Sequence, residues 1–276
     1  MVRGDTSYRK IVSAVDGSFH SELAARHAIA IATSCGSELI VLAVDTGEVE
    51  REDLSAAVER VCHQAGGCGI HPSGAVRSGE VVKTILDAVT GEHADLVVAA
   101  TRRGDHRFFV RSITQKLMLK APCSVLAVKP AGIAKRGKSM LVPVAHRENN
   151  PGERILLTSS LAAYYHYQVE LLHVVERQHW YYLPTEKLQK LRRYGEGNMM
   201  PVTKALKEKG VPVEMRAVVA SSSTTAILKE AAIGRHTLVL VGASRRGVLK
   251  QVVAGNPIEE LLSHILCDVL VWRPQP

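Results

Sequence analysis

The segment ADLVVAATRRG at residues 94–104 recurs, with conservative changes, as TLVLVGASRRG at residues 237–247. In each copy a short aliphatic run ends in a hydroxyl residue, two arginines and a glycine. Such a run, bounded by turn residues, is typical of a strand buried on both faces of a parallel sheet. The recurrence indicates that the chain contains two copies of one domain.

The duplication extends outward from this segment in both directions. Three further pairs of aliphatic runs keep the same order: residues 10–16 with 140–144, 39–44 with 169–174, and 123–128 with 267–272. The offset between the copies grows from 129 to 144 residues, so the second copy carries extra residues. We expect them between 179 and 201.

Each copy alternates strands with Ala- and Leu-rich helical stretches, which predicts a parallel sheet covered by helices on both faces. The fold class is therefore α/β, with two tandem flavodoxin-like or Rossmann-like domains, each built on a parallel five-stranded sheet. We expect the first domain at residues 1–131 and the second at 138–276. The polar, glycine-containing stretch at 130–138 is interpreted as a linker between them.

Composition narrows the class of protein further. Hydrophobic residues make up 46% of the chain and aromatic residues 4%, which suits helices packed on aliphatic strands. The sequence shows no membrane-spanning run and no signal peptide, and its five scattered cysteines favour a reduced compartment. We therefore expect a cytoplasmic protein without a membrane partner. The net charge of +8 is compatible with an anionic ligand.

Candidate binding residues follow the strands, because an open parallel sheet binds ligands at the carboxyl ends of its strands. Asp16 follows the first strand in an Asp-Gly-Ser turn and could accept hydrogen bonds from ribose hydroxyls. The simpler interpretation is that Asp16 shapes the turn and Ser18 caps the next helix. In the second copy Gly242 ends a strand, and Gly255-Asn256 precedes a helix whose amino end could hold a phosphate. A structural Asn cap is the alternative there.

Together these features resemble the universal stress protein family. Its nucleotide-binding branch has an Asp after the first strand and a Gly-x2-Gly-x9-Gly-(Ser/Thr) loop after the fourth. The resemblance covers nearly the whole chain and implies an adenine nucleotide alpha hydrolase-like fold. It also implies dimeric assembly through the fifth strand, which the halves of a tandem chain imitate as an intramolecular pseudo-dimer. A further homodimer of tandem chains stays open.

The resemblance carries over unevenly to the first half. It keeps Asp16, and it assigns the adenine contact to Val44. Ala99 and Arg102 replace the first two glycines of the loop, and Ser112 stands at the final Ser/Thr position. The expected nucleotide-binding residues of this half are Asp16, Val44, Arg102 and Ser112.

The second half keeps a different part of the pattern. Gly242 and Gly255 match two glycines, while Arg245 and Asn256 occupy the positions of the second glycine and the Ser/Thr. Val174 takes the adenine position. In this half Ala145 replaces the aspartate, so the two halves complement rather than duplicate each other.

The arginines allow two interpretations. Their positive charges could bind phosphates at positions where the loop lacks glycines. Alternatively, the arginines are solvated and the altered loops bind no nucleotide. The residues concerned are Arg102, Arg103, Arg107, Arg111, Arg245 and Arg246.

The resulting hypothesis is a stress-response protein that senses or sequesters ATP or a related adenine nucleotide, with Mg²⁺ as a companion ion. The alternative is a nucleotide-free family member that acts through dimer-like protein interactions. The sequence has no nucleophile elbow and no Walker-type phosphate loop. We therefore expect no enzyme activity beyond slow ATP hydrolysis, and no catalytic residues.

Three other patterns have simpler explanations. The Cys and His residues within 62–71 match no standard zinc spacing, so we expect no metal site there. The aromatic and basic residues at 180–193 could contact nucleic acid, but an amphipathic, solvated helix is favoured and nucleic acid is not expected as a partner. The hydroxyl-rich stretch at 221–225 is interpreted as a helix cap.

Overall fold

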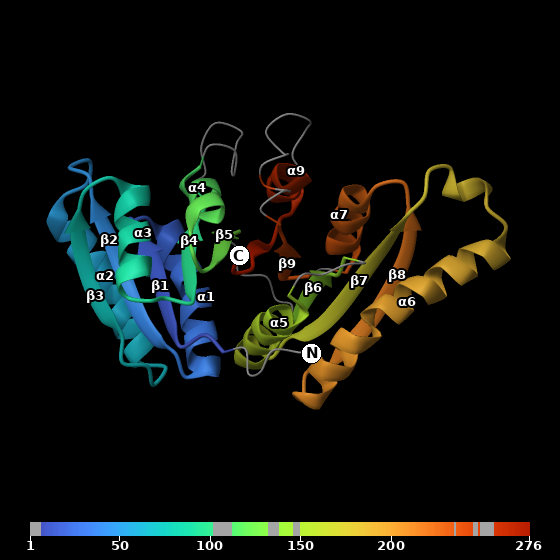
Figure 1. Cartoon of the computed structure of the whole chain (residues 1–276), viewed down its shortest axis with the longest axis horizontal. Helices are drawn as coiled ribbons and strands as arrows, with labels where there is room; N and C mark the ends of the chain where they lie inside the picture. The colour runs from blue at the N-terminus through green and yellow to red at the C-terminus, as the bar shows by residue number, and fades with distance from the viewer. Residues whose placement is uncertain are drawn as a thin grey trace.

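The computed structural model describes residues 7–101, 112–131, 138–145, 150–234, 236–244, 248 and 257–276. The described strands form one sheet across the molecule, with helices above and below it (Figure 1). Two like halves meet at the middle of this sheet, so the tandem arrangement of α/β domains is confirmed.

The first half alternates strand and helix throughout. Its elements are β1 (Lys10–Val15), α1 (Phe19–Cys35), β2 (Glu38–Asp45), α2 (Arg51–Gly66), β3 (Ser73–Ser78), α3 (Val81–Gly91), β4 (Leu96–Ala100), α4 (Ile113–Lys120) and β5 (Ser124–Lys129).

The second half repeats this order with one addition, the 3-10 turn η1. Its elements are β6 (Ser139–Pro143), α5 (Pro151–Tyr165), β7 (Gln168–Glu176), η1 (Trp180–Tyr182), α6 (Thr185–Glu208), β8 (Val213–Ala220), α7 (Ser223–Ile233), β9 (Leu238–Gly242), α9 (Pro257–His264) and β10 (Asp268–Arg273).

The strand order is β3-β2-β1-β4-β5-β10-β9-β6-β7-β8. Within each half the paired strands are parallel, whereas β5 and β10 pair antiparallel, with Val128 opposite Leu270. An antiparallel pair at the centre places the carboxyl ends of one half's strands at the same edge as the amino ends of the other's. The fifth strands therefore join the halves as the family resemblance implied.

Helices cover both faces of the sheet. One hydrophobic core contains side chains of α1, α2, α5 and α6, and the other contains side chains of α3, α4, α7 and α9. Helix α1 shows how the sequence sets these elements. Ser18 caps its first turn, Ala24 and Ala28 pack against the sheet, and Gly36 ends it in the left-handed conformation at φ +66°.

Buried polar contacts reinforce the junction between the halves. The Glu153 carboxylate accepts hydrogen bonds from Tyr8 Oη at 2.5 Å, from Trp272 Nε1 at 3.2 Å and from Ser124. Tyr8 and Ser124 belong to the first half, whereas Glu153 and Trp272 belong to the second. Burial and the neighbouring Glu153 carboxylate raise the pKa of Tyr8 well above its ordinary value. One carboxylate therefore ties both halves together.

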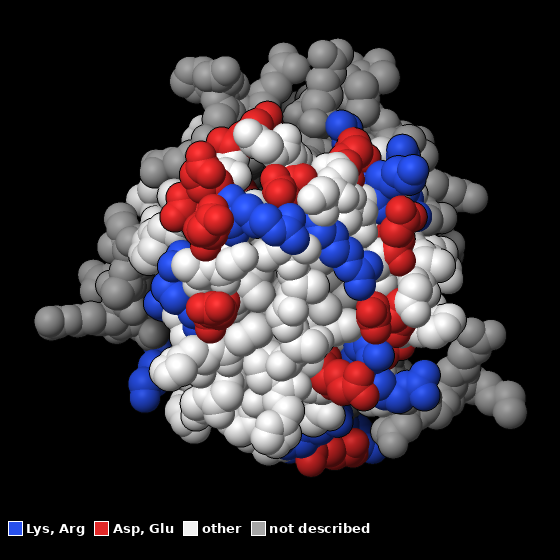
Figure 2. All heavy atoms as spheres, turned by 90° about the vertical axis from the view of Figure 1, so that its left-hand side faces the viewer, with Lys and Arg blue, Asp and Glu red and all other residues white. Residues whose placement is uncertain are grey.

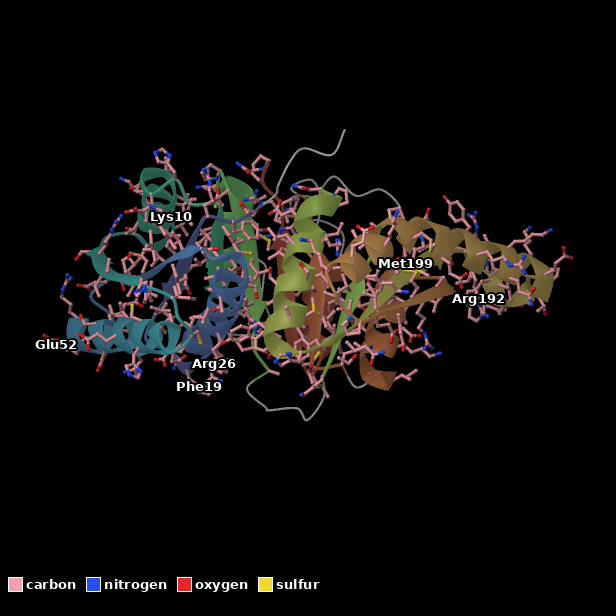
Figure 3. All side chains as sticks on the ribbon, turned by 90° about the horizontal axis from the view of Figure 1, so that it is seen from below. Lys10, Phe19, Arg26, Glu52, Arg192 and Met199 are labelled. Atoms are coloured by element: carbon pink, nitrogen blue, oxygen red, sulfur yellow. The ribbon has the colours of Figure 1, made fainter. Side chains whose placement is uncertain are left out.

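Extra residues of the second half form η1 and lengthen α6, as the growing offset predicted. Helix α6 has 24 residues, whereas its counterpart α2 has 16. Met199 on α6 is buried, but Arg192 lies on the part that extends beyond the body of the molecule (Figure 3).

Surface charge is mixed where it can be seen at the first-half end of the molecule. Positive and negative side chains are interspersed there around an uncharged centre (Figure 2). The net positive charge is therefore not gathered on that face. Across the described ranges, none of the helices is long and apolar enough to cross a membrane.

Candidate functional site

The first strand-order reversal lies between β1 and β4, where the chain passes from one side of β1 to the other. Ala14 of β1 lies opposite Ala99 of β4 in the parallel register. Asp16 and Thr101 each follow two residues later, so both lie at the carboxyl edge of these neighbouring strands. Parallel sheets bind ligands at such reversals.

Asp16 is held in a tight turn. Its carboxylate accepts hydrogen bonds from the Ser18 backbone N–H at 3.0 Å and from Ser18 Oγ at 2.6 Å. Gly17 between them has φ +78°, a conformation that glycine adopts without steric cost. Ser18 Oγ in turn accepts from the Ser21 N–H at 3.2 Å and so caps α1. The predicted turn and cap are confirmed; they fix the Asp16 carboxylate at the strand end.

Thr101 was not singled out from the sequence. Its backbone N–H donates to the Val128 carbonyl at 2.7 Å, and its side chain is 2% exposed. Within the described part of the chain, Thr101 Oγ1 has no hydrogen-bond partner. A buried hydroxyl without a partner is costly unless something else satisfies it. Its place directly after the β4 run is the signal that could have identified it.

Ser112 is the N-cap of α4, the helix that follows β4. Its Oγ accepts from the Gln115 N–H at 3.1 Å and shares a hydrogen bond with Thr114 Oγ1 at 2.8 Å. The amino end of α4 therefore carries the Ser that the family pattern expects. Arg102, together with Arg103, Arg107 and Arg111, lies outside the described residues.

Val44 lies one residue before the end of β2 and is half-buried against the core that contains α3 and α4. The next residue, Asp45, accepts hydrogen bonds from the Gly47 N–H at 2.9 Å and from Arg51 at 3.1 Å, which lower its pKa. Val174 has the equivalent half-buried place in β7. The two predicted adenine positions are thus structurally equivalent.

The second strand-order reversal, between β6 and β9, has a different structure. The register of β6 with β9 contains two residue pairs, ending at Leu141 opposite Val239, whereas β1 and β4 share four. The Arg154 side chain lies beyond that last pair. Its Nη1 donates to the Pro143 carbonyl at 3.0 Å.

The guanidinium of Arg154 occupies the space beside Gly242. A Cβ at Gly242 would overlap Arg154 Nη2, and the guanidinium carbon lies 5.4 Å from the Trp272 ring centre. Arg154 is only 3% exposed. Gly242 is therefore explained by the close approach of an arginine, a role that sequence reasoning missed.

The two halves differ here through one helix position. Arg154 in α5 and Ala24 in α1 each lie 12 residues before the C-cap of their helix, His166 and Gly36. Where the first half has a methyl group against the sheet, the second has a buried cation. Ala145 is exposed after β6, while Arg245, Gly255 and Asn256 lie outside the described residues.

The cysteine and histidine cluster has structural contacts. Cys68 Sγ lies 3.2 Å from Tyr164 Oη, and Cys62 Sγ faces Gly74 on β3. Among the described residues there is no group of three or more Cys, His, Asp or Glu side chains arranged to hold a metal ion.

The fold and its paired strand-order reversals define a tandem α/β protein with a Rossmann-like strand order in each half. The model of the universal stress protein family matches residues 7–129 and 138–273. The chain belongs to the universal stress protein family. A curated universal stress protein of Methanocaldococcus jannaschii is 28% identical over 144 residues, which cover 46% of this chain and 85% of the relative.

Solved structures agree with this fold over nearly the whole chain. A universal stress protein of Archaeoglobus fulgidus superimposes with a TM-score of 0.62 at 15% identity, covering 98% of this chain and 97% of its own. The cytoplasmic domain of a prokaryotic cation chloride cotransporter gives a TM-score of 0.65 at 11% identity, covering 97% and 95%. At these identities the likeness establishes the fold alone.

Proposed function

We propose that the first half of this universal stress protein binds an adenine nucleotide of the ATP type. The observation that carries the proposal is the gathering of Asp16, Thr101 and the amino end of α4 at one strand-order reversal. A nucleotide needs acceptors for its ribose hydroxyls and donors for its phosphates, and this edge offers both kinds of group.

Each group has a role that matches its chemistry. A carboxylate can accept about four hydrogen bonds, so the contacts of Asp16 with Ser18 are compatible with a ribose hydroxyl as a further donor. The backbone of Val44 would meet the adenine ring. The phosphates would lie near the α4 amino end at Ser112, where the helix dipole favours negative charge. Mg²⁺ would accompany the phosphates.

The second half is the less favourable site. Arg154 fills the space beside Gly242 and is held there by the Pro143 carbonyl and the Trp272 ring. A ligand that approached Gly242 closely would have to displace this buried side chain. We therefore assign the nucleotide to the first half, and regard Val174 as a structural counterpart of Val44.

We propose binding rather than turnover. Asp16 is held in a turn by Ser18, so its carboxylate has a structural task at the site. The chain would act as a sensor or sequestering module, through the conformation of the loaded half or through a partner that recognises it. Slow hydrolysis would be incidental.

A thermal-shift and calorimetric titration with ATP, ADP and AMP tests the proposal. A ligand specific for the native state at 100 times its Kd raises the free energy of unfolding by about 2.7 kcal/mol. We expect stabilisation of the wild type and at least a tenfold rise in Kd for Asp16→Ala, as for loss of a charge-assisted hydrogen bond (~1.5–3 kcal/mol). Asp87→Ala, an exposed change on α3 with the same loss of charge, should bind like the wild type.

The alternative, a nucleotide-free interaction protein, is favoured by one observation, the filling of the second site by Arg154. It predicts no stabilisation by any of the three nucleotides at millimolar concentration. That outcome would refute the binding proposal. A Kd that rises in Gly242→Ala but not in Asp16→Ala would place the nucleotide in the second half instead.

A further inference from the structure

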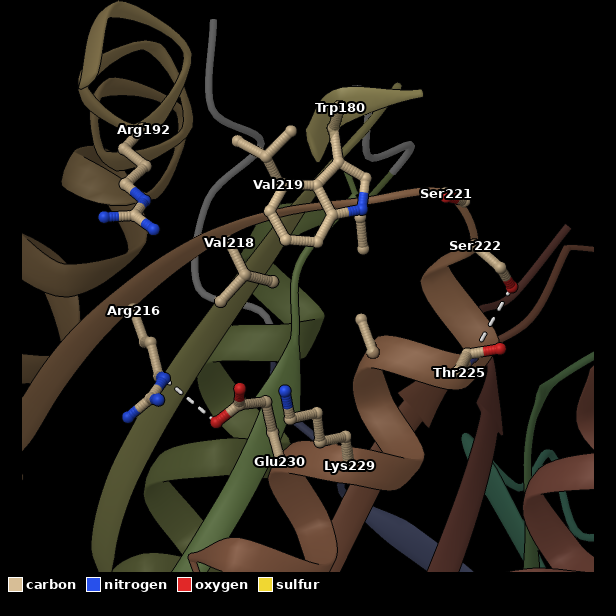
Figure 4. Close-up of a pocket in the computed structure, with 12 residues that line it drawn as sticks. Trp180, Arg192, Arg216, Val218, Val219, Ser221, Ser222, Thr225, Lys229 and Glu230 are labelled. Atoms are coloured by element: carbon tan, nitrogen blue, oxygen red, sulfur yellow. Dashed lines mark hydrogen bonds and ion pairs between the residues drawn. The ribbon is translucent and has the colours of Figure 1, made fainter. Parts of the chain in front are cut away.

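A hollow of about 420 Å³ lies at the outer edge of the second half, over the carboxyl end of the edge strand β8 (Figure 4). Pockets that bind small molecules begin at about 300 Å³. Three separate segments line it: Trp180 in η1, Arg192 in α6, and the stretch from β8 into α7. It is distinct from the strand-order reversals, which lie nearer the middle of the sheet.

The hollow has an apolar side. Val218, Val219 and Ala226 line it, and the last two are each 8% exposed. The half-buried indole of Trp180 stands beside Val219 (Figure 4). A flat ring and aliphatic side chains form a surface that suits an aromatic ring.

The other side of the hollow is positively charged. Arg216 Nε pairs with the Glu230 carboxylate at 2.9 Å, which neutralises both groups. In the described part of the chain, Arg192 and Lys229 have neither an ion-pair nor a hydrogen-bond partner. Two positive charges at one hollow therefore lack a counter-charge.

Hydroxyl groups and a helix end also line the hollow. Ser222 Oγ accepts from the Thr225 N–H at 3.4 Å and caps α7, as predicted for this stretch. Ser221, Ser222 and Thr225 all line the hollow. The positive end of the α7 dipole lies there as well and favours an anion.

We propose that this hollow binds a small aromatic anion, with its ring against Trp180 and Val218 and its carboxylate or similar group against Lys229, while the charge of Arg192 adds to the attraction. A neutral aromatic compound would leave both cations unpaired, and a cation would be repelled. The η1 turn and the extended part of α6, which supply Trp180 and Arg192, have no counterpart among the described elements of the first half. The insertion thereby gives one half a ligand site of its own.

The chain contains two tryptophans, which makes the site directly observable. Trp272 is 1% exposed and its Nε1 donates to Glu153, far from the hollow in sequence and structure. The indole N–H signals in a ¹H–¹⁵N spectrum therefore give one reporter and one internal control. We expect 2-naphthoate to shift the Trp180 signal in a saturable manner and to leave the Trp272 signal in place.

Ligand and protein variants separate charge from hydrophobicity. The neutral 2-naphthamide should bind roughly tenfold more weakly than 2-naphthoate, because one charge-assisted contact is lost. Lys229→Met and Arg192→Met should each raise the Kd for 2-naphthoate by about three- to tenfold. Arg193→Met removes a neighbouring exposed charge of α6 that does not line the hollow, and should leave the Kd unchanged.

Three results would overturn the proposal. The first is no saturable Trp180 shift with 2-naphthoate at millimolar concentration. The second is equal affinity for 2-naphthoate and 2-naphthamide, which would make the hollow merely hydrophobic. The third is a Trp180 shift with ATP but none with 2-naphthoate, which would assign the hollow to nucleotides.

Discussion

Arg154 and Gly242 meet at the carboxyl ends of β6 and β9, so closely that a Cβ on Gly242 would overlap the guanidinium. The arginine comes from α5 and the glycine from the end of β9. Arg154 is buried beside the Trp272 ring, whereas Gly242 is exposed. In the described part of the first half, Ala24 has the helix position equivalent to Arg154. This one contact separates the two halves chemically.

We expect Gly242→Ala to destabilise the protein by about 1–3 kcal/mol, because the new Cβ would overlap the guanidinium of the buried Arg154. In an Arg154→Ala background the same change should cost at least about 1 kcal/mol less, because the clashing group is gone. Urea unfolding of the four proteins gives this coupling energy. Gly197→Ala is the control, since a Cβ there meets nothing within 4 Å. Equal costs in both backgrounds would show that Arg154 does not limit the space at Gly242.

Glu153→Gln tests the junction between the halves. The amide nitrogen of the glutamine would replace Oε2 and face the donor Asn150 Nδ2, which lies 2.8 Å from it. Tyr8 Oη and Trp272 Nε1 would then donate to a neutral oxygen in place of a charged one. We expect a loss of about 2–4 kcal/mol in the free energy of unfolding. Glu52→Gln, an exposed change on α2, should stay within about 0.5 kcal/mol of the wild type. A Glu153→Gln protein as stable as the wild type would contradict the assigned role.

Asp268, which contacts His27 across the junction between the halves, makes the free energy of unfolding depend on pH. Burial alone would raise the pKa of Asp268, but the hydrogen bond and charge of His27, with the Ala131 N–H at 2.7 Å, lower it overall. Because the pKa of Asp268 is lower in the folded protein than the value of about 3.9 in the unfolded chain, its ionised carboxylate stabilises the folded protein above about pH 3.9. This contribution to the free energy of unfolding is lost as the pH falls through the pKa of the folded protein.

Asp268→Asn should therefore cost about 1 kcal/mol at pH 7, and the difference from the wild type should shrink below about pH 3.9. Unfolding by urea at a series of pH values between 7 and 3 measures this difference. A difference that stays constant, or grows as the pH falls, would exclude the lowered pKa as the cause.

The buried Cys123 should resist alkylation. Burial raises the pKa of its thiol to about 12, so almost none of it is thiolate at neutral pH. We expect iodoacetamide to leave Cys123 unmodified in the native protein while the half-buried Cys68 reacts, with complete labelling of both in urea. Peptide mass spectrometry provides the measurement. Native labelling of Cys123 at the rate of Cys68 would show that β5 opens readily.

Much of the fold could be predicted because it depends on local patterns. Aliphatic runs bounded by turn residues identified the strands, and their recurrence identified the two halves. Ser18 and Ser222 were recognised as helix caps, which need only a hydroxyl at the right spacing. The insertion was also placed correctly, since it follows from the offset between the repeats.

The site was less predictable. Gly242 matches a glycine of the family's nucleotide-binding loop. The sequence alone does not show whether the space beside such a glycine is taken by a phosphate or by an arginine side chain. Arg154 occupies the first turn of a helix, a place where arginines are normally solvated. The Arg154 side chain lies beyond Leu141 and Val239, where the pairing of β6 with β9 ends, and no local pattern encodes that end.

The sequence by itself therefore determined the duplicated α/β architecture, the family, and the positions of Asp16 and Ser112 at strand and helix ends, because propensity, periodicity and capping act between near neighbours. Only the tertiary structure decided which side chains lie at each strand-order reversal and which charged side chains without a partner line the same hollow. Arg154 reaches Gly242, and Trp180 joins Lys229 at one hollow, across many intervening residues. Such contacts depend on how helices pack on the sheet.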